Sequence, residues 1–132
     1  MCMIDSLDEH CTVWATEDRI AAKPHKCDEC ARTIAKRETY RRCSWLQEGR
    51  WDSSCMCIHC MVAAEWLRLN CGGYVTHGIG ADLEEHVEEY AHLALGSRLS
   101  RLYLGMRHRW TLRRGPHAGE LRPLPAMPSV VE

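Results

Sequence analysis

The spacing of apolar and polar residues changes twice along the chain. Between residues 33 and 53, Thr39, Tyr40 and the segment Cys43-Ser44-Trp45-Leu46 supply the β-forming side chains of one strand. Gln47-Glu48-Gly49-Arg50 is typical of a turn, and Trp51 opens a second strand. The pattern therefore predicts a β-hairpin over 33–53.

Beyond residue 57 the period becomes helical. The first apolar stripe comprises Ile58, Met61, Val62, Trp66 and Leu69, and Gly72-Gly73 follows its end. A second stripe, with Asp82 as the expected N-cap, comprises Leu83, Val87, Tyr90 and Ala94. A third comprises Leu99, Leu102, Tyr103, Met106 and Trp110, and Gly96-Ser97 is expected to separate it from the second. Three helices are predicted.

These elements divide the chain into four parts. Residues 1–22 form an acidic N-terminal segment without clear periodicity, and residues 23–71 form the module with the hairpin. Residues 72–114 form a helical extension, with an acidic helix followed by an Arg-rich one, and residues 115–132 form a Pro-containing tail. The expected fold class is α+β.

Composition adds one unusual feature, which is nine cysteines in 132 residues. The acidic start Met1-Cys2-Met3-Ile4-Asp5 lacks the apolar run of a secretory signal, and no segment approaches the roughly 18 apolar residues that cross a membrane. We therefore expect no membrane association and a reducing cytoplasm, where closely spaced cysteines bind metals more often than they form disulfides.

Four cysteines have the spacing of a zinc site. Cys27-x-x-Cys30 and Cys57-x-x-Cys60 are two such pairs, one ahead of the predicted hairpin and one at the start of the predicted helix. Structural zinc takes four tetrahedral thiolate or imidazole ligands, and a helix N-terminus favours thiolate. The order of knuckle, hairpin and helix is that of a treble-clef zinc finger, here with two additional C-terminal helices.

Several residues leave the ligand set open. Cys55 lies two residues before Cys57, and His25 and His59 flank the two pairs, so that any of them is an alternative ligand. Buried thiols without metal are the simpler alternative for all four cysteines. The remaining cysteines lack paired spacing, and a second zinc site among them is less favoured: Cys2, Cys11, Cys43 and Cys71.

The motif Lys23-Pro24-His25-Lys26-Cys27-Asp28-Glu29-Cys30, followed by Tyr40, Trp51 and Cys57-Ile58-His59-Cys60, resembles small treble-clef zinc-finger proteins encoded by bacteriophages and prophages. The Arg-rich segment 102–110 is also similar to the end of such proteins. The resemblance implies the fold, bound Zn²⁺ and a viral origin, and hence the cytoplasm of a bacterial host cell. It implies no specific activity.

The sequence argues against an enzyme. Four cysteines close the zinc shell and leave no position for an activated water. Nuclease variants of the treble clef need a His near the hairpin and His or Asn on the helix, but residues 31–54 contain no His and the helix from Ile58 to Leu69 offers only His59.

Two classes of partner remain. Acidic and basic blocks alternate, which suits a protein interface. For a phage accessory protein, which the resemblance implies, such an interface would bind and modulate a host protein complex such as a defence machine. Nucleic acid is the alternative partner, with Arg side chains beside Trp45, Trp51 and Trp110 combining phosphate contacts with base stacking. A third interpretation pairs the basic helix with the acids of 82–89. The expected partner contacts are Arg41, Arg42, Arg107, Arg109 and Arg113. The oligomeric state is not specified.

Overall fold

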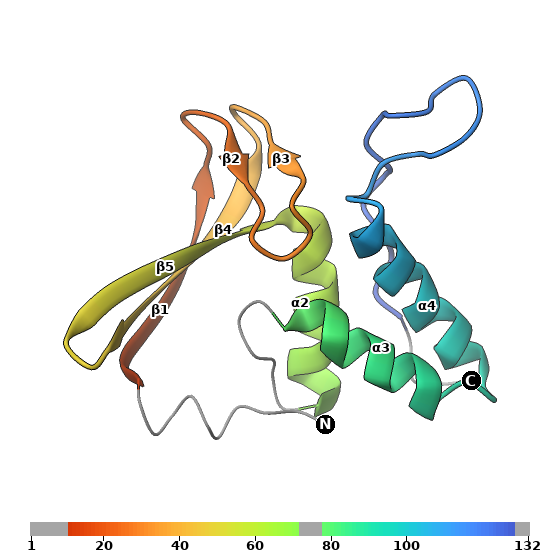
Figure 1. Ribbon diagram of the computed structural model, residues 1–132, viewed down its shortest axis with the longest axis horizontal. Coiled ribbons are helices and arrows are strands. Elements are labelled where there is room, and N and C mark those ends of the chain that lie inside the picture. The colour runs from red at the N-terminus through yellow and green to blue at the C-terminus, as the bar shows by residue number, and fades with distance from the viewer. Residues whose placement is uncertain (1–10, 72–77, 129–132) are drawn as a thin grey trace.

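The computed structural model of the protein describes residues 11–71 and 78–128. The chain is α+β, with antiparallel strands followed by helices (Figure 1). In chain order the elements are β1 (Cys11–Ile20), β2 (His25–Lys26), β3 (Thr33–Ile34), β4 (Thr39–Gln47), β5 (Arg50–Cys57), α2 (Ile58–Cys71), α3 (Ile79–Glu89) and α4 (Ala94–Arg107). The Gly-rich link before α3 and both chain ends lie mainly outside the described residues.

The predicted hairpin is confirmed as β4 and β5, which pair from Tyr40 opposite Cys57 to Gln47 opposite Arg50. Glu48 and Gly49 form its two-residue loop, and both have positive φ, 52° and 77°. A type I′ turn needs positive φ at both central residues, and its twist matches that of the strands. The second strand extends to Cys57 and delivers this cysteine to the start of α2.

Strand β1 was not anticipated from the sequence. It pairs antiparallel with β4 along its length, with Ile20 opposite Thr39 and Glu17 opposite Arg42, so the sheet order is β1-β4-β5. Its side chains from Ala15 to Ile20 are all exposed. Exposed side chains over 15–20 give no apolar alternation, and for that reason this part of the strand had no strand signal in the sequence.

Helix α2 ends at Cys71, close to the predicted Gly stop, but its most buried face differs from the expected stripe. The fully buried side chains include Ala63, Trp66 and Leu67, whereas Leu69 is 61% exposed. Met61 and Val62 from the expected stripe are only half-buried. Small Ala residues define the face on which α3 and α4 approach, and apolar periodicity gives Ala too little weight to detect it.

The corner between α3 and α4 also differs from the prediction. Helix α3 begins at Ile79 rather than at an Asp82 cap, and α4 begins at Ala94, so that Gly96 lies inside its first turn. A Cβ at Gly96 would come within 2.2 Å of the Tyr90 carbonyl oxygen. Gly96 therefore permits close packing of two helices rather than separating them.

One apolar core joins the hairpin base, the cysteines and the three helices. It contains Tyr40, Met56, Trp66, Leu83 and Leu99 among others. Trp51 lies outside this core and is 65% exposed. None of the helices in the described part of the chain is long and apolar enough to traverse a bilayer.

Candidate metal centre

The first cysteine pair is held by a tight turn between β2 and β3. The Cys27 N–H donates to the Arg32 carbonyl at 2.9 Å, and the Ala31 N–H donates to the Cys27 carbonyl at 2.9 Å. Closing this turn places Ala31 at a φ of 68°, a left-handed conformation that costs a residue with a Cβ about 1–2 kcal/mol. The turn directs Cys27 and Cys30 into the core.

The second pair comes from the junction of β5 and α2. Cys57 is the last residue of β5 and Cys60 lies in the first turn of α2, so the helix N-terminus points toward the sulfur atoms. The Asp28 N–H donates to the Cys55 carbonyl at 2.8 Å, and the Asp28 carboxylate accepts a hydrogen bond from the Cys55 N–H at 2.7 Å. These two bonds fix the knuckle beside the end of β5.

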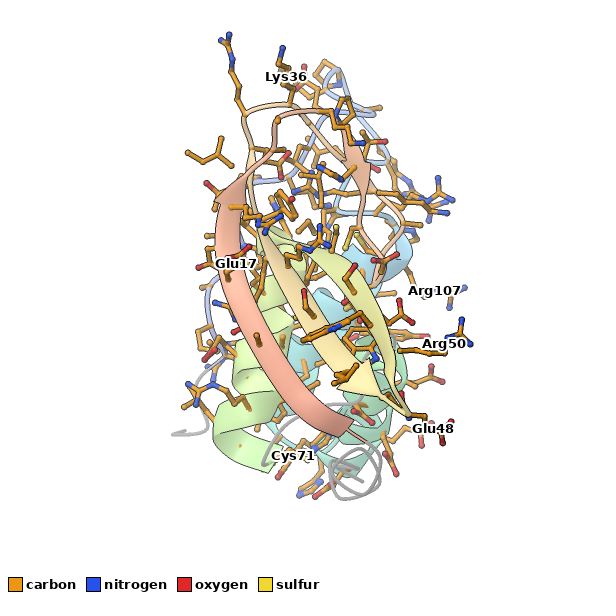
Figure 2. All side chains as sticks on the ribbon, turned by 90° about the vertical axis from the view of Figure 1, so that its left-hand side faces the viewer. Glu17, Lys36, Glu48, Arg50, Cys71 and Arg107 are labelled. Atoms are coloured by element: carbon orange, nitrogen blue, oxygen red, sulfur yellow. The ribbon has the colours of Figure 1, made fainter. Side chains whose placement is uncertain are left out.

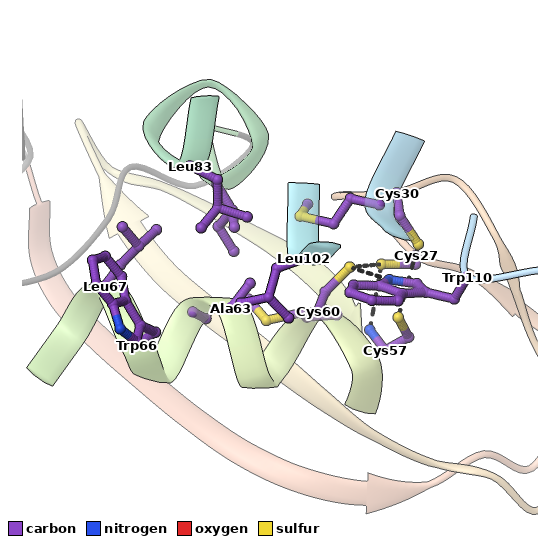
Figure 3. Close-up of a cluster of buried hydrophobic side chains, with 14 of the residues drawn as sticks. Cys27, Cys30, Cys57, Cys60, Ala63, Trp66, Leu67, Leu83, Leu102 and Trp110 are labelled. Carbon is purple, nitrogen blue, oxygen red and sulfur yellow. Dashed lines mark hydrogen bonds between the residues drawn. The ribbon is translucent and has the colours of Figure 1, made fainter. Parts of the chain in front are cut away.

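The four thiols form one buried cluster (Figure 3). The Cys27 and Cys60 sulfur atoms are 3.8 Å apart, as are those of Cys30 and Cys57, and all four lie within 4.8 Å of one another. A tetrahedron with metal–sulfur bonds near 2.3 Å has edges of about 3.8 Å. The cluster therefore has the dimensions of a four-coordinate thiolate site.

Crowding of the thiols changes their acidity. Hydrogen bonds from the other three thiols lower the pKa of Cys27 far below its ordinary value, while the same contacts raise the pKa of Cys60 far above it. The protonation of each thiol therefore depends on that of the other three. A divalent cation at the centre would replace these protons and satisfy all four sulfur atoms together.

The structure does not bring the alternative ligands into the cluster. Cys55 is half-exposed and lies outside the four-sulfur cluster, and the His25 ring packs on Tyr40 with centroids 4.9 Å apart. Both ring nitrogens of His59 lie within hydrogen-bonding distance of groups other than the cluster: Nε2 is 2.7 Å from the Arg122 carbonyl oxygen, and Nδ1 is 3.4 Å from Arg32 Nη2. The described residues contain no second group of three metal-ligating side chains, although Cys43 and Cys71 belong to them.

His59 and Arg32 belong to a buried polar network beside the thiols. Arg32 is 5% exposed and forms an ion pair with Glu38. Burial acts to lower the pKa of Arg32, but Glu38 and the Cys57 thiolate next to it raise the value overall. Burial, followed by repulsion from Arg32, lowers the pKa of His59, which agrees with a neutral ring that donates from Nε2. Because four thiolates around a divalent cation carry a net charge of −2, the fixed Arg32 cation compensates part of that charge.

A contact from the C-terminal extension completes the shell. Trp110 follows α4, is 2% exposed, and donates its indole N–H to the Cys60 sulfur at 3.3 Å. Its ring lies 5.4 Å from that of His59. The Cys57 N–H donates to the Cys27 sulfur at 3.3 Å. Sequence reasoning placed Trp110 on an apolar stripe but gave no sign of its bond to a ligand, since 50 residues separate the two.

The knuckle also contacts the acidic helix. The Glu29 carboxylate accepts a hydrogen bond from the Ile79 N–H at 3.3 Å, at the first turn of α3. A carboxylate at this position satisfies a free helix N–H and is favoured by the helix dipole. The candidate metal centre is thus linked to β5, α2, α3 and the segment after α4.

The structure separates the five expected contact arginines into different settings. Arg41 bonds Asp18 at 2.9 Å and lies 3.9 Å from Glu65, so it joins β1, β4 and α2. Arg42, next to it, points to the opposite face of the sheet and forms no ion pair with any described residue. Arg107, Arg109 and Arg113 are exposed at the end of α4 and just after it, on the other side of α2 from the sheet (Figure 1).

The tryptophans expected beside these arginines are also separated. Trp45 and Trp110 are buried, at 9% and 2% exposed, so neither can stack on a base. Trp51 is the exposed one of these three tryptophans.

The chain was compared with protein-family models, with curated proteins and with solved structures. None of these comparisons finds a match.

Proposed function

We propose that the protein is a zinc-stabilised, non-enzymatic binding module of treble-clef type, with Cys27, Cys30, Cys57 and Cys60 as the ligands. The observation that carries the proposal is the four-sulfur cluster, whose 3.8 Å separations fit a tetrahedral Zn²⁺ shell. The order of knuckle, hairpin and helix around the cluster supports the treble-clef assignment.

The composition of the shell supports a structural rather than a catalytic role. All four thiols are buried, and the groups around them include a guanidinium, an indole N–H and the backbone N–H of Cys57, which stabilise negative charge on sulfur. Four thiolates leave no coordination position for water or substrate. Zinc in this position would hold the hairpin and helices in place, and recognition would belong to their surfaces.

The charge distribution on those surfaces favours a binding role. Between α4 and α3 the Tyr103 hydroxyl donates a hydrogen bond to the Glu84 carboxylate at 2.8 Å. Among the described residues no ion pair joins the two helices through Arg101, Arg107 or Arg109. These cations, and Arg42 on the sheet, are available to a partner.

Two finer predictions rest on the resemblance to phage proteins. They are a role as a phage accessory protein in a bacterial cytoplasm and a host protein complex as the target. A pull-down from bacterial lysate with the zinc-loaded chain tests the second. Nucleic acid is the competing partner, and the exposed Trp51 with the unpaired Arg42 is the observation that favours it.

The zinc proposal has a direct test. The purified chain should contain one equivalent of zinc, and Co²⁺ in its place should give the strong visible absorption of a tetrahedral four-thiolate site. Removing the metal with a chelator should unfold the chain and expose Trp110, with a red shift of tryptophan fluorescence. Less than half an equivalent of metal, or an unchanged fold after chelation, would contradict the proposal.

A further inference from the structure

The sheet has a second face, and toward the hairpin loop the side chains of this face lie outside the core. In β4 and β5 this outer face consists of alternate residues, with Ser44 directly opposite Ser53 and Arg42 opposite Cys55. Leu46 opposite Trp51 forms the row next to the hairpin loop. Figure 2 views the sheet with α2 behind it. No described helix packs on this part of the sheet.

A shallow hollow crosses the outer face and the adjoining edge. Its lining consists of Arg42, Ser44, Trp51, Asp52 and Ser53. The two serines are short, so they form a low floor between the indole at one end and the guanidinium at the other. Arg42 is half-buried and lies opposite Glu17 of β1, but it forms no ion pair with an acid of the described residues.

We propose that this hollow binds single-stranded nucleic acid, with one unpaired base stacked on Trp51 and an adjacent phosphate at Arg42. The inference rests on the proposed binding function and names the partner class. Ser44 and Ser53 lie between the two positions and can donate hydroxyl hydrogen bonds to phosphate or to a base edge.

The chemistry of the lining favours a nucleotide over a peptide anchor. Apart from Trp51, every residue that lines the hollow is polar, so an apolar side chain of a peptide would find little surface to bury. A base needs one flat aromatic face and polar groups at its edge, which is the arrangement present here. Bases inside a duplex are already stacked, so an exposed indole selects unpaired ones.

The charges around the hollow agree with this orientation. Asp52 is the carboxylate in the lining, and its Oδ1 accepts the Ser53 N–H at 2.8 Å at the Trp51 end. On the outer face of β1, Glu17 is paired with Arg19. Phosphate is therefore favoured at the Arg42 end and disfavoured beside Asp52, so that the base lies toward the hairpin loop.

The test uses the full zinc-loaded chain and a single-stranded oligonucleotide of about ten nucleotides, in DNA and RNA form. Binding should quench tryptophan fluorescence and weaken linearly in log K against log salt. Trp51→Ala should weaken binding about 10-fold or more, since stacking contributes ~1–3 kcal/mol per base. Arg42→Gln should weaken binding and reduce the salt slope by about one.

Matched controls separate this site from general charge attraction. Arg114→Gln removes an exposed cation away from the sheet and should leave the quench unchanged, and Ser53→Glu should abolish binding by placing a carboxylate in the hollow. Zinc content and circular dichroism confirm that each variant is folded. No quench at low salt, equal loss in Arg114→Gln and Arg42→Gln, or equal binding of polyglutamate would overturn the inference, and each would leave the zinc proposal intact.

Discussion

The indole of Trp110 occupies the space in which any side chain at Gly105 would lie. A Cβ on Gly105 would come within 2.2 Å of Cζ3 of the Trp110 ring. The chain returns sharply after α4, with the Trp110 N–H bonded to the Gly105 carbonyl at 2.7 Å. Because Gly105 has no side chain, the Trp110 indole can lie against it and donate its N–H to the sulfur of Cys60.

Gly105→Ala should therefore displace Trp110 and weaken the metal centre. Overpacking in a core costs about 1–3 kcal/mol, and the displaced indole also loses its bond to Cys60. We expect the free energy of unfolding to fall by ~2–3 kcal/mol and zinc release to a chelator to accelerate. Urea unfolding and stopped-flow chelation measure the two effects.

Gly80→Ala is the control for helix propensity. Apart from the adjoining backbone of α3, no atom of the described residues lies within 4 Å of a Cβ at Gly80, so alanine should be neutral or stabilise by up to about 1 kcal/mol. Equal behaviour of the two alanine variants would show that the contact between Gly105 and Trp110 contributes nothing.

The indole N–H of Trp110 can be tested separately from its ring. Trp110→Phe retains an aromatic ring but removes the donor to Cys60, and a hydrogen bond to a charged acceptor contributes about 1.5–3 kcal/mol. Trp66→Phe removes similar volume from a buried indole whose Nε1 has no hydrogen-bond partner among the described residues. We expect Trp110→Phe to be more destabilising by ~1–2 kcal/mol in denaturant unfolding. A larger decrease in the free energy of unfolding for Trp66→Phe than for Trp110→Phe would contradict a stabilising hydrogen bond from Trp110 to Cys60.

The ligand assignment predicts a difference between neighbouring cysteines. Cys60→Ser should remove one thiolate of four, and the chain should lose stoichiometric zinc and cooperative unfolding. Cys55→Ser changes a half-exposed thiol outside the cluster and should retain one equivalent of zinc. Elemental analysis after gel filtration distinguishes the two, and zinc loss in Cys55→Ser with retention in Cys60→Ser would reverse the assignment.

The sequence predicted the elements that have strong local signals. The Gly49 turn and the alternating strands around it gave the hairpin, and the C-x-x-C spacing identified the four cysteines that the fold brings together. Each depends on residues close in sequence.

Long-range relations were missed for a physical reason. In β1 the side chains from Ala15 to Ile20 are exposed, and the strand pairs with β4, a contact that no periodicity reports. Trp110 reaches Cys60 from 50 residues away, and Arg41 and Arg42 diverge because adjacent strand residues point to opposite faces. Gly96 lies against the Tyr90 carbonyl and Gly105 against the Trp110 ring. Neither contact can be predicted from the local sequence, because each depends on how the chain turns after a helix.

The ion pair between Arg32 and Glu38 predicts a pH dependence. Burial acts to raise the pKa of Glu38, but the hydrogen bond from Arg32 lowers it below its ordinary 4.5. A carboxyl with a depressed folded pKa stabilises the fold above its unfolded pKa and loses this contribution as pH falls through the folded value. Glu38→Gln should cost about 1.5–3 kcal/mol at pH 7, and the difference from the unmodified chain should shrink below about pH 4.5.

Both chains lose zinc in acid, so the comparison uses the difference between their unfolding free energies at each pH. Zinc loss contributes equally to the two and cancels. A difference that stays constant from neutral pH to about pH 3 would mean that the Glu38 carboxylate does not depend on Arg32 in the way inferred here.

The last prediction concerns the strained turn that presents Cys27 and Cys30. Ala31 has a φ of 68°, where a Cβ is unfavourable by about 1–2 kcal/mol, while glycine there costs ~0.5–1 kcal/mol more unfolded-state entropy. Ala31→Gly should therefore stabilise the chain by up to about 1 kcal/mol and raise zinc affinity up to about 5-fold, because folding of this turn accompanies metal binding. Ala35→Gly, outside the positive-φ region, should instead destabilise by ~0.4–1 kcal/mol. Competition for zinc with a chromophoric chelator measures both, and weaker binding by Ala31→Gly would show that the turn stores no strain that limits metal binding.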